Sequence, residues 1–252
     1  MNTLMGIYNV TGHYDFESQT STMKVEDLIK FLDYAKSSPG NPLDTYLIAN
    51  IEYDHTKMDE LIGTKYMRVA EWEKAIEYAS SEIHWKSNYK IDFAKEMLTM
   101  EKEAAIMKGD AQCQRYYDLA IRYAQAGYTG DCWYLTQYSK SVVDTVGVNE
   151  KDFAAIAYQL LQKASMAKDK KLKEKALFGS CYYYFHSNHM LTNEWNNATS
   201  SFETIEHPES SEFQTWLALE KFELSTGQPT ADFISNCDCY KVFRDRNRHC
   251  KC

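Results

Sequence analysis

Apolar residues recur every three or four positions along most of the chain, which is the spacing of one helical face. The clearest run lies in residues 150–167, where Phe153, Ala157, Leu161 and Ala164 fall on one side of a helix. The same spacing predicts helices near residues 24–36, 43–53, 57–69, 71–82, 90–107, 112–126, 131–145, 150–167, 170–187, 193–205, 211–225 and 230–247.

Proline, glycine and hydroxyl residues mark where these helices begin and end. Asn41 and Pro42 have the order of an N-cap followed by the first helical residue. Ser210 and Ser211 stand before Glu212, which predicts a helix start there. Gly227 follows a periodic segment, where a residue that tolerates a left-handed conformation closes a helix.

The predicted helices pair into hairpins. Their first members begin near residues 57, 90, 131, 170 and 211, a spacing of about 33 to 42 residues that is typical of helical-repeat solenoids. The sequence therefore predicts an all-α fold with one helical repeat domain over residues 23–248. Residues 1–22 are expected to form an irregular arm or the remnant of a preceding repeat, and residues 249–252 a cysteine-containing tail.

Composition agrees with a helical fold and limits the partners. The chain of 252 residues has only 10 glycines and 4 prolines, fewer than loop-rich β-sandwiches use. The formal net charge of -8 disfavours nucleic acid as a partner, because the phosphate backbone would meet a repulsive field. The longest apolar runs are a few residues, well below the roughly 20 that span a bilayer, so no transmembrane segment is expected.

Two glycines lie inside strongly periodic helices, where each costs about 1 kcal/mol relative to alanine. Gly63 and Gly179 each follow a large apolar residue, and a tyrosine stands three positions later in both cases. A residue without a Cβ lets a second helix approach closely, and this close approach offsets the cost.

These positions resemble the tetratricopeptide repeat (TPR). The first copy is Ile62, Gly63, Tyr66, Trp72, Ala75 and Tyr78, and the second is Phe178, Gly179, Tyr182, Trp195, Ala198 and Phe202. The resemblance implies a right-handed α-solenoid, TPR-like and irregular, whose concave face is formed by the first helix of each pair. It also implies that residues 193–205 form the second helix of the second copy.

In the TPR family the concave face binds peptides or extended protein segments. By register, the resemblance places the partner-binding positions at Lys57, Glu60, Thr64, Met67, Arg68, Lys173, Ser180, Tyr183 and Tyr184. It implies a non-enzymatic scaffold that binds a peptide or protein partner. The alternative is a carbohydrate-binding or small-molecule-binding α/α domain, or a weakly enzymatic one, that uses its aromatic side chains.

Chemical motifs give little support for catalysis or a cofactor. The sequence has no phosphate-binding GxxxxGK[ST], no dinucleotide-binding GxGxxG, no HExxH and no GxSxG motif. His186 and His189 have the spacing of a metal-chelating pair, but a polar loop at a helix end is the favoured interpretation. We therefore expect no catalytic residue, no metal and no cofactor.

Four cysteines lie close together near the end of the sequence, at Cys237, Cys239, Cys250 and Cys252. Three interpretations are open: a soft-metal site, one or two disulfides, or unpaired thiols, of which the last is favoured. The odd total of 7 cysteines favours a reducing, cytoplasmic location, with an exported protein whose signal has been removed as the alternative. The oligomeric state is not indicated.

Overall fold

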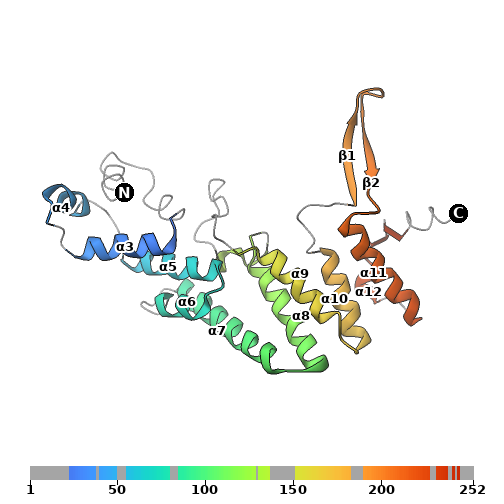
Figure 1. Cartoon of the computed structure of the whole chain (residues 1–252), viewed down its shortest axis with the longest axis horizontal. Coiled ribbons are helices and arrows are strands. Elements are labelled where there is room, and N and C mark those ends of the chain that lie inside the picture. The colour runs from blue at the N-terminus through green and yellow to red at the C-terminus, as the bar shows by residue number, and fades with distance from the viewer. Residues whose placement is uncertain are drawn as a thin grey trace. The chain divides into compact units, whose positions relative to one another are not determined.

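The computed structural model describes ten segments of the chain: residues 23–37, 40–49, 55–79, 85–128, 130–136, 151–182, 190–227, 231–237, 240–241 and 243–244. Most of them are helical (Figure 1). The α-helices are α3 (Val25–Lys36), α4 (Pro42–Ala49), α5 (His55–Arg68), α6 (Trp72–Ala79), α7 (Trp85–Ile106), α8 (Gly109–Ala126), α9 (Phe153–Ala164), α10 (Lys170–Tyr182), α11 (Ser211–Thr226) and α12 (Asp232–Ser235). A short 3-10 helix, η1, covers Trp133–Leu135, and two strands, β1 (Leu191–Asn196) and β2 (Ser201–Glu206), precede α11.

Helix ends follow the capping signals of the sequence. The Asn41 side chain accepts a hydrogen bond from the Leu43 amide at 2.9 Å, and Pro42 is the first residue of α4. The Ser210 hydroxyl accepts from the Phe213 amide at 3.2 Å, and Gly227 closes α11 in the left-handed conformation with φ 60°. The predicted boundaries at these points are confirmed.

The described residues divide into two compact units, one formed by residues up to 101 with 125–152 and the other by 102–124 with residues from 153 onward. The sequence had predicted one domain over residues 23–248. Helices α7 and α8 each contribute residues to both units.

In the first unit, α5 and α6 form a helical hairpin that carries the first TPR-like copy. Gly63 is buried in α5, and Trp72 and Ala75 are buried in α6. The rings of Tyr66 and Tyr78 lie 5.6 Å apart between their centroids and join the two helices. Helix α3 also packs on α5 and buries Leu28, Phe31 and Leu32.

In the second unit, α10 packs against both α9 and α11. Gly179 is the point of close approach between α10 and α9, because a Cβ placed there would lie 3.1 Å from Leu161 Cδ2. The sequence correctly assigned close helix packing to Gly179, but the neighbour is the preceding helix rather than a following one.

A second apolar core of this unit surrounds Trp216 of α11. Its buried members are Cys181, Trp216, Leu219, Ile234, Cys237, Tyr240 and Phe243. The Tyr240 hydroxyl donates a hydrogen bond to the Glu223 carboxylate, so the segment after α12 is tied to α11. Burial, followed by this hydrogen bond, raises the pKa of Tyr240 and keeps the phenol protonated.

The helix predicted over residues 193–205 is wrong, because these residues belong to an antiparallel β-hairpin. β1 pairs with β2 from Leu191 opposite Glu206 to Asn196 opposite Ser201. The loop between them adopts a turn in which the Asn196 side chain accepts from the Ala198 amide at 2.8 Å. Polar side chains that bond to nearby backbone groups favour turns over helices, and residues 196–201 consist almost entirely of asparagine, threonine and serine.

Replacing Gly179 with valine tests the close approach of α9 and α10. The branched side chain would clash with the fully buried Leu161, and overpacking of this kind costs about 1–3 kcal/mol. We expect Gly179→Val to lower the free energy of unfolding in urea by that amount. A Cβ placed on Gly40 would meet no atom within 4 Å, so Gly40→Val should cost under about 0.5 kcal/mol. Equal losses in the two variants would contradict the packing argument.

Candidate interaction surfaces

The side chains that the sequence assigned to a groove in α5 take part in internal contacts of the first unit. Thr64 and Met67 are almost fully buried, and Arg68 is buried as well. Glu60 is partly exposed, and the Lys57 side chain lies outside the described residues. The structure thus gives Thr64, Met67 and Arg68 a packing role where a groove was expected.

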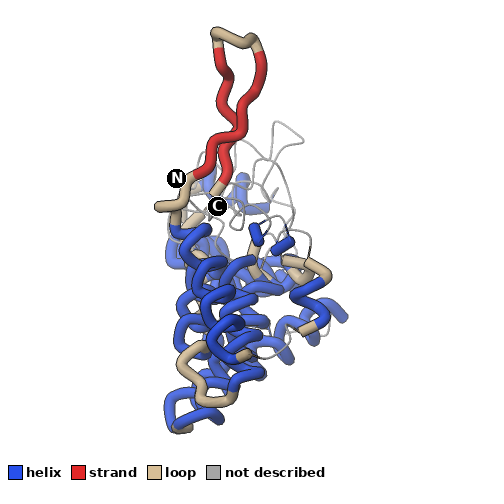
Figure 2. The backbone as a smooth tube through the Cα atoms, turned by 90° about the vertical axis from the view of Figure 1, so that its right-hand side faces the viewer, coloured by secondary structure: helices blue, strands red, loops and turns tan. Residues whose placement is uncertain are grey.

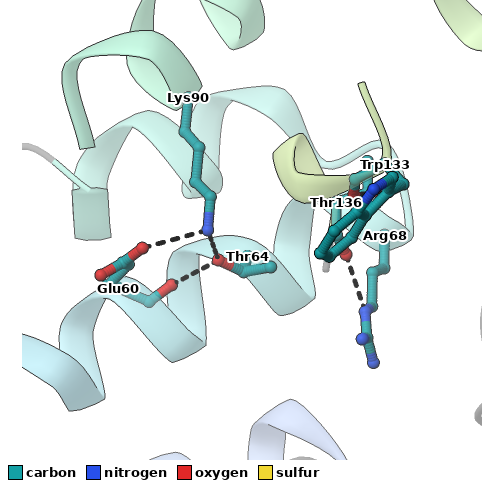
Figure 3. A network of polar contacts seen from close by, with 6 residues as sticks. All are labelled: Glu60, Thr64, Arg68, Lys90, Trp133 and Thr136. Atoms are coloured by element: carbon teal, nitrogen blue, oxygen red, sulfur yellow. Dashed lines mark hydrogen bonds and ion pairs between the residues drawn. The ribbon is translucent and has the colours of Figure 1, made fainter. Parts of the chain in front are cut away.

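The reason is a polar network built around a buried lysine of α7 (Figure 3). Lys90 Nζ lies 3.1 Å from Glu60 Oε1 and donates to Thr64 Oγ1 at 2.8 Å. Thr64 Oγ1 in turn donates to the Glu60 backbone carbonyl at 2.7 Å. A buried ammonium requires such partners, so the Lys90 side chain occupies the polar positions of α5 that the TPR register assigns to a groove.

Arg68 is held at the other end of α5 by the segment that contains η1. Its Nε donates to the Thr136 carbonyl at 2.7 Å (Figure 3), and the Thr136 hydroxyl donates to the Ala126 carbonyl at 2.6 Å. The Arg68 carbonyl accepts from the Lys151 amide at 3.3 Å. These bonds fix Arg68 as a connector within the unit.

The proposed positions in α10 are divided between the core and the surface. Ser180 is fully buried, donates to the Ala176 carbonyl at 2.9 Å and accepts from Gln162 Nε2 at 3.1 Å. Lys173 is partly exposed, with its Nζ 5.4 Å from the centroid of the Phe222 ring. Tyr183 and Tyr184, together with His186 and His189, lie outside the described residues.

The β-hairpin presents the most exposed aromatic pair of the second unit. Trp195 and Phe202 face each other across the strands with their ring centroids 5.1 Å apart, yet 52% of Trp195 and 70% of Phe202 remain exposed. Figures 1 and 2 show the hairpin standing clear of α11. The TPR register had placed both rings in a packed helix, and the run of turn-forming residues between them was the missed signal.

Hydrogen bonds close the base of the hairpin, and one of them reaches α11. The His207 amide donates to the Met190 carbonyl at 2.8 Å, and the Met190 amide donates to Glu212 Oε2 at 2.7 Å. Thr192 Oγ1 and His207 Nε2 lie 2.8 Å apart. This β-hairpin, residues 191–206, is called the arm from here on. It is fixed at its base, while its aromatic pair stays open to solvent.

A charged hollow of about 340 Å³ lies on the second unit where α8 and the start of α10 approach. Its lining residues are Asp110, Gln114, Asp169, Lys171, Leu172 and Lys175. The Asp110 carboxylate accepts from the backbone amides of Lys168 and Asp169 at 2.7 and 3.1 Å. It therefore already stabilises the loop before α10. A single leucine among polar residues is unlike the mostly apolar pockets that bind small molecules.

Within the described part of the chain, no three His, Cys, Asp or Glu side chains gather in a way that could hold a metal ion. Cys237 is buried in the core around Trp216, and Cys239, Cys250 and Cys252 lie outside the described residues. Among the described helices, none combines the length and the apolar character that crossing a bilayer requires.

Comparisons with protein-family models, with curated proteins and with solved structures find no match to this chain.

Replacing Lys90 with methionine tests the network in the first unit. The change leaves the Glu60 carboxylate without its buried cation, and we expect a loss of about 2–3 kcal/mol in the free energy of unfolding. Adding Glu60→Gln should recover part of the loss, with a coupling energy of about 0.5–3 kcal/mol. Lys95→Met, on the exposed side of α7, is the matched control and should cost under about 0.5 kcal/mol. Similar losses for Lys90 and Lys95 would show that the network contributes nothing.

The cysteines should differ in reactivity according to burial. Burial raises the pKa of the Cys181 thiol well above its ordinary value, so little thiolate forms near pH 8 and alkylation is slow. Cys132 is only partly buried, and we expect iodoacetamide to modify it at least roughly tenfold faster than Cys181, measured by peptide mass spectrometry. The difference should vanish in denaturant. Equal rates in the folded protein would contradict the burial of Cys181.

Proposed function

We propose that this chain is a non-enzymatic protein-interaction module, in which TPR-like helical pairs form an irregular right-handed solenoid that supports a peptide-binding or protein-binding arm. Packing of α5 on α6, α9 on α10 and α10 on α11, each pair consecutive helices in the sequence, supports the repeat array, and α3 adds a contact with α5 across α4.

The observation that carries the proposal is the exposed Trp195 and Phe202 pair. Aromatic side chains supply most of the contact energy at many protein interfaces, because they bury a large area at little cost in side-chain entropy. The exposed part of the two rings contributes no burial energy to the hairpin, and an isolated two-stranded hairpin is only marginally stable in water. A protein partner would bury both rings.

The arm replaces the groove as the favoured binding surface. Thr64, Met67, Arg68 and Ser180 are buried, so binding at those positions would require opening the helical framework. Glu60 and Lys173 keep partial exposure but already have partners in Lys90 and Phe222. The charged hollow beside α10 gives no support to the alternative of a small-molecule binder, because Leu172 is the one apolar residue in its lining.

Affinity capture with matched variants tests this function. We expect the double variant Trp195→Ala/Phe202→Ala to recover about tenfold less of any specific partner from an extract of the source cells than the unaltered chain. Met166→Ala/Leu224→Ala is the control, since these side chains are 77% and 72% exposed in the same unit but outside the hairpin.

Circular dichroism should show the same helix content in all three proteins. Equal recovery by the two double variants would remove the hairpin from the binding surface. Absence of any specific protein from all captures would count against an interaction module.

A further inference from the structure

We infer that the hairpin binds a basic, extended protein segment as a third β-strand, and that the segment alternates cationic and apolar side chains. This inference rests on the proposed function and specifies its partner. It follows from the two faces of the hairpin, its charge and its unpaired edges.

The two faces of the hairpin differ in chemistry. Residues directly opposite each other in an antiparallel pair share a face, and successive residues alternate between faces. One face carries the Trp195 and Phe202 pair, while the other carries Glu194 opposite Glu203. A strand docked on the outer edge of β1 would lie beside Trp195 on one face and Glu194 on the other, and one docked on β2 would lie beside Phe202 and Glu203.

The Glu194 and Glu203 pair is unfavourable for the hairpin by itself, because like charges directly opposite each other destabilise a strand pair. Neither carboxylate forms an ion pair with a described residue. Among the described residues Glu203 accepts from two neutral donors, the Asn196 side-chain amide at 2.7 Å and the Thr199 hydroxyl at 3.3 Å. A cationic side chain on a strand added at either edge would lie beside one of the two carboxylates and offset the repulsion between them.

The sequence around the hairpin supplies no such cation. Residues 176–220 contain no lysine or arginine. Their acidic residues are Glu194, Glu203, Glu206, Glu209, Glu212 and Glu220. The charge of the arm is therefore complementary to a basic partner and repels a nucleic acid.

The edges of the hairpin offer the backbone groups that a third strand needs. In the described chain β1 and β2 form a two-stranded sheet, so each strand has an outer edge without a strand neighbour. An extended peptide can add to such an edge by main-chain hydrogen bonds, while its alternate side chains determine specificity. In a segment that alternates Arg or Lys with an apolar residue, the cations would lie on the Glu194 face and the apolar groups beside Trp195.

The same charges oppose pairing between the hairpins of two copies of this chain. An edge-to-edge pair of hairpins would bring two sets of glutamates together, which is one way in which proteins prevent association of exposed edges. A foreign basic strand is favoured over a second copy for this reason.

Peptide binding to the full chain tests the inference. The probe is a fluorescein-labelled peptide of about eight residues that alternates arginine and valine, a length that matches one strand. Its controls are a peptide of the same composition with all arginines in one block, and a peptide that alternates glutamate and valine. We expect fluorescence anisotropy to show binding of the alternating basic peptide, weaker binding of the block peptide and none of the acidic one.

Charge reversal on the arm provides the matched variants. Glu194→Lys/Glu203→Lys keeps a like-charged pair in the same register, and we expect about tenfold weaker binding of the basic peptide. Glu73→Lys/Asp92→Lys changes the net charge equally at exposed sites of the first unit and should leave binding unchanged. Raising the salt from about 0.05 M to about 0.5 M should weaken the basic complex.

The outcomes separate this inference from the proposed function. Equal binding of the alternating and block peptides, equal effects of the two charge reversals, or absence of peptide binding would overturn the basic-strand inference. If Trp195→Ala/Phe202→Ala still reduces partner capture about tenfold in that case, the interaction function stands with a different partner. A self-associated chain that dissociates on Glu194→Lys/Glu203→Lys, measured by sedimentation, would assign the arm to a second copy and also overturn the inference.

Discussion

Short helices depend on their neighbours for stability, because an isolated helix of fewer than about 15 residues is marginal in water. Helix α6 has 8 residues and α10 has 13, so each persists through the apolar surface that it buries. Trp72 and Ala75 bury α6 against its surroundings, and Gly179 lets α10 approach Leu161 closely. The packing of neighbouring helices thus underlies both units and supports the arm.

Close packing also decides what happens to the polar residues of α5. The buried Lys90 side chain of α7 requires acceptors, and Glu60 and Thr64 of α5 provide them. The same residue types would suit a groove that binds a charged peptide. Residue type and helical register alone do not distinguish an internal packing contact from a binding groove, because the difference depends on which other helix contacts α5.

Local signals in the sequence were sufficient for much of the helical framework. The caps at Asn41 and Ser210 and the close approach at Gly179 are properties of a few adjacent residues, and the structure bears them out. The hairpin was missed because Trp195 and Phe202 are also seven residues apart, a spacing that fits two helical turns. The contact of Lys90 with Glu60 joins residues thirty positions apart, and helical periodicity contains no information about it.

The core around Trp216 has a consequence for how the protein is made. Trp216 stacks on Tyr240 and Phe243, whose centroids lie 5.7 and 6.2 Å from its own, and these rings are synthesised after all of α11. A nascent chain that stops at residue 227 would therefore leave one side of this tryptophan and the Cys181 region uncovered. Chaperones and proteases recognise exposed apolar surface of this kind, and Tyr240 and Phe243 cover it only after they have been synthesised.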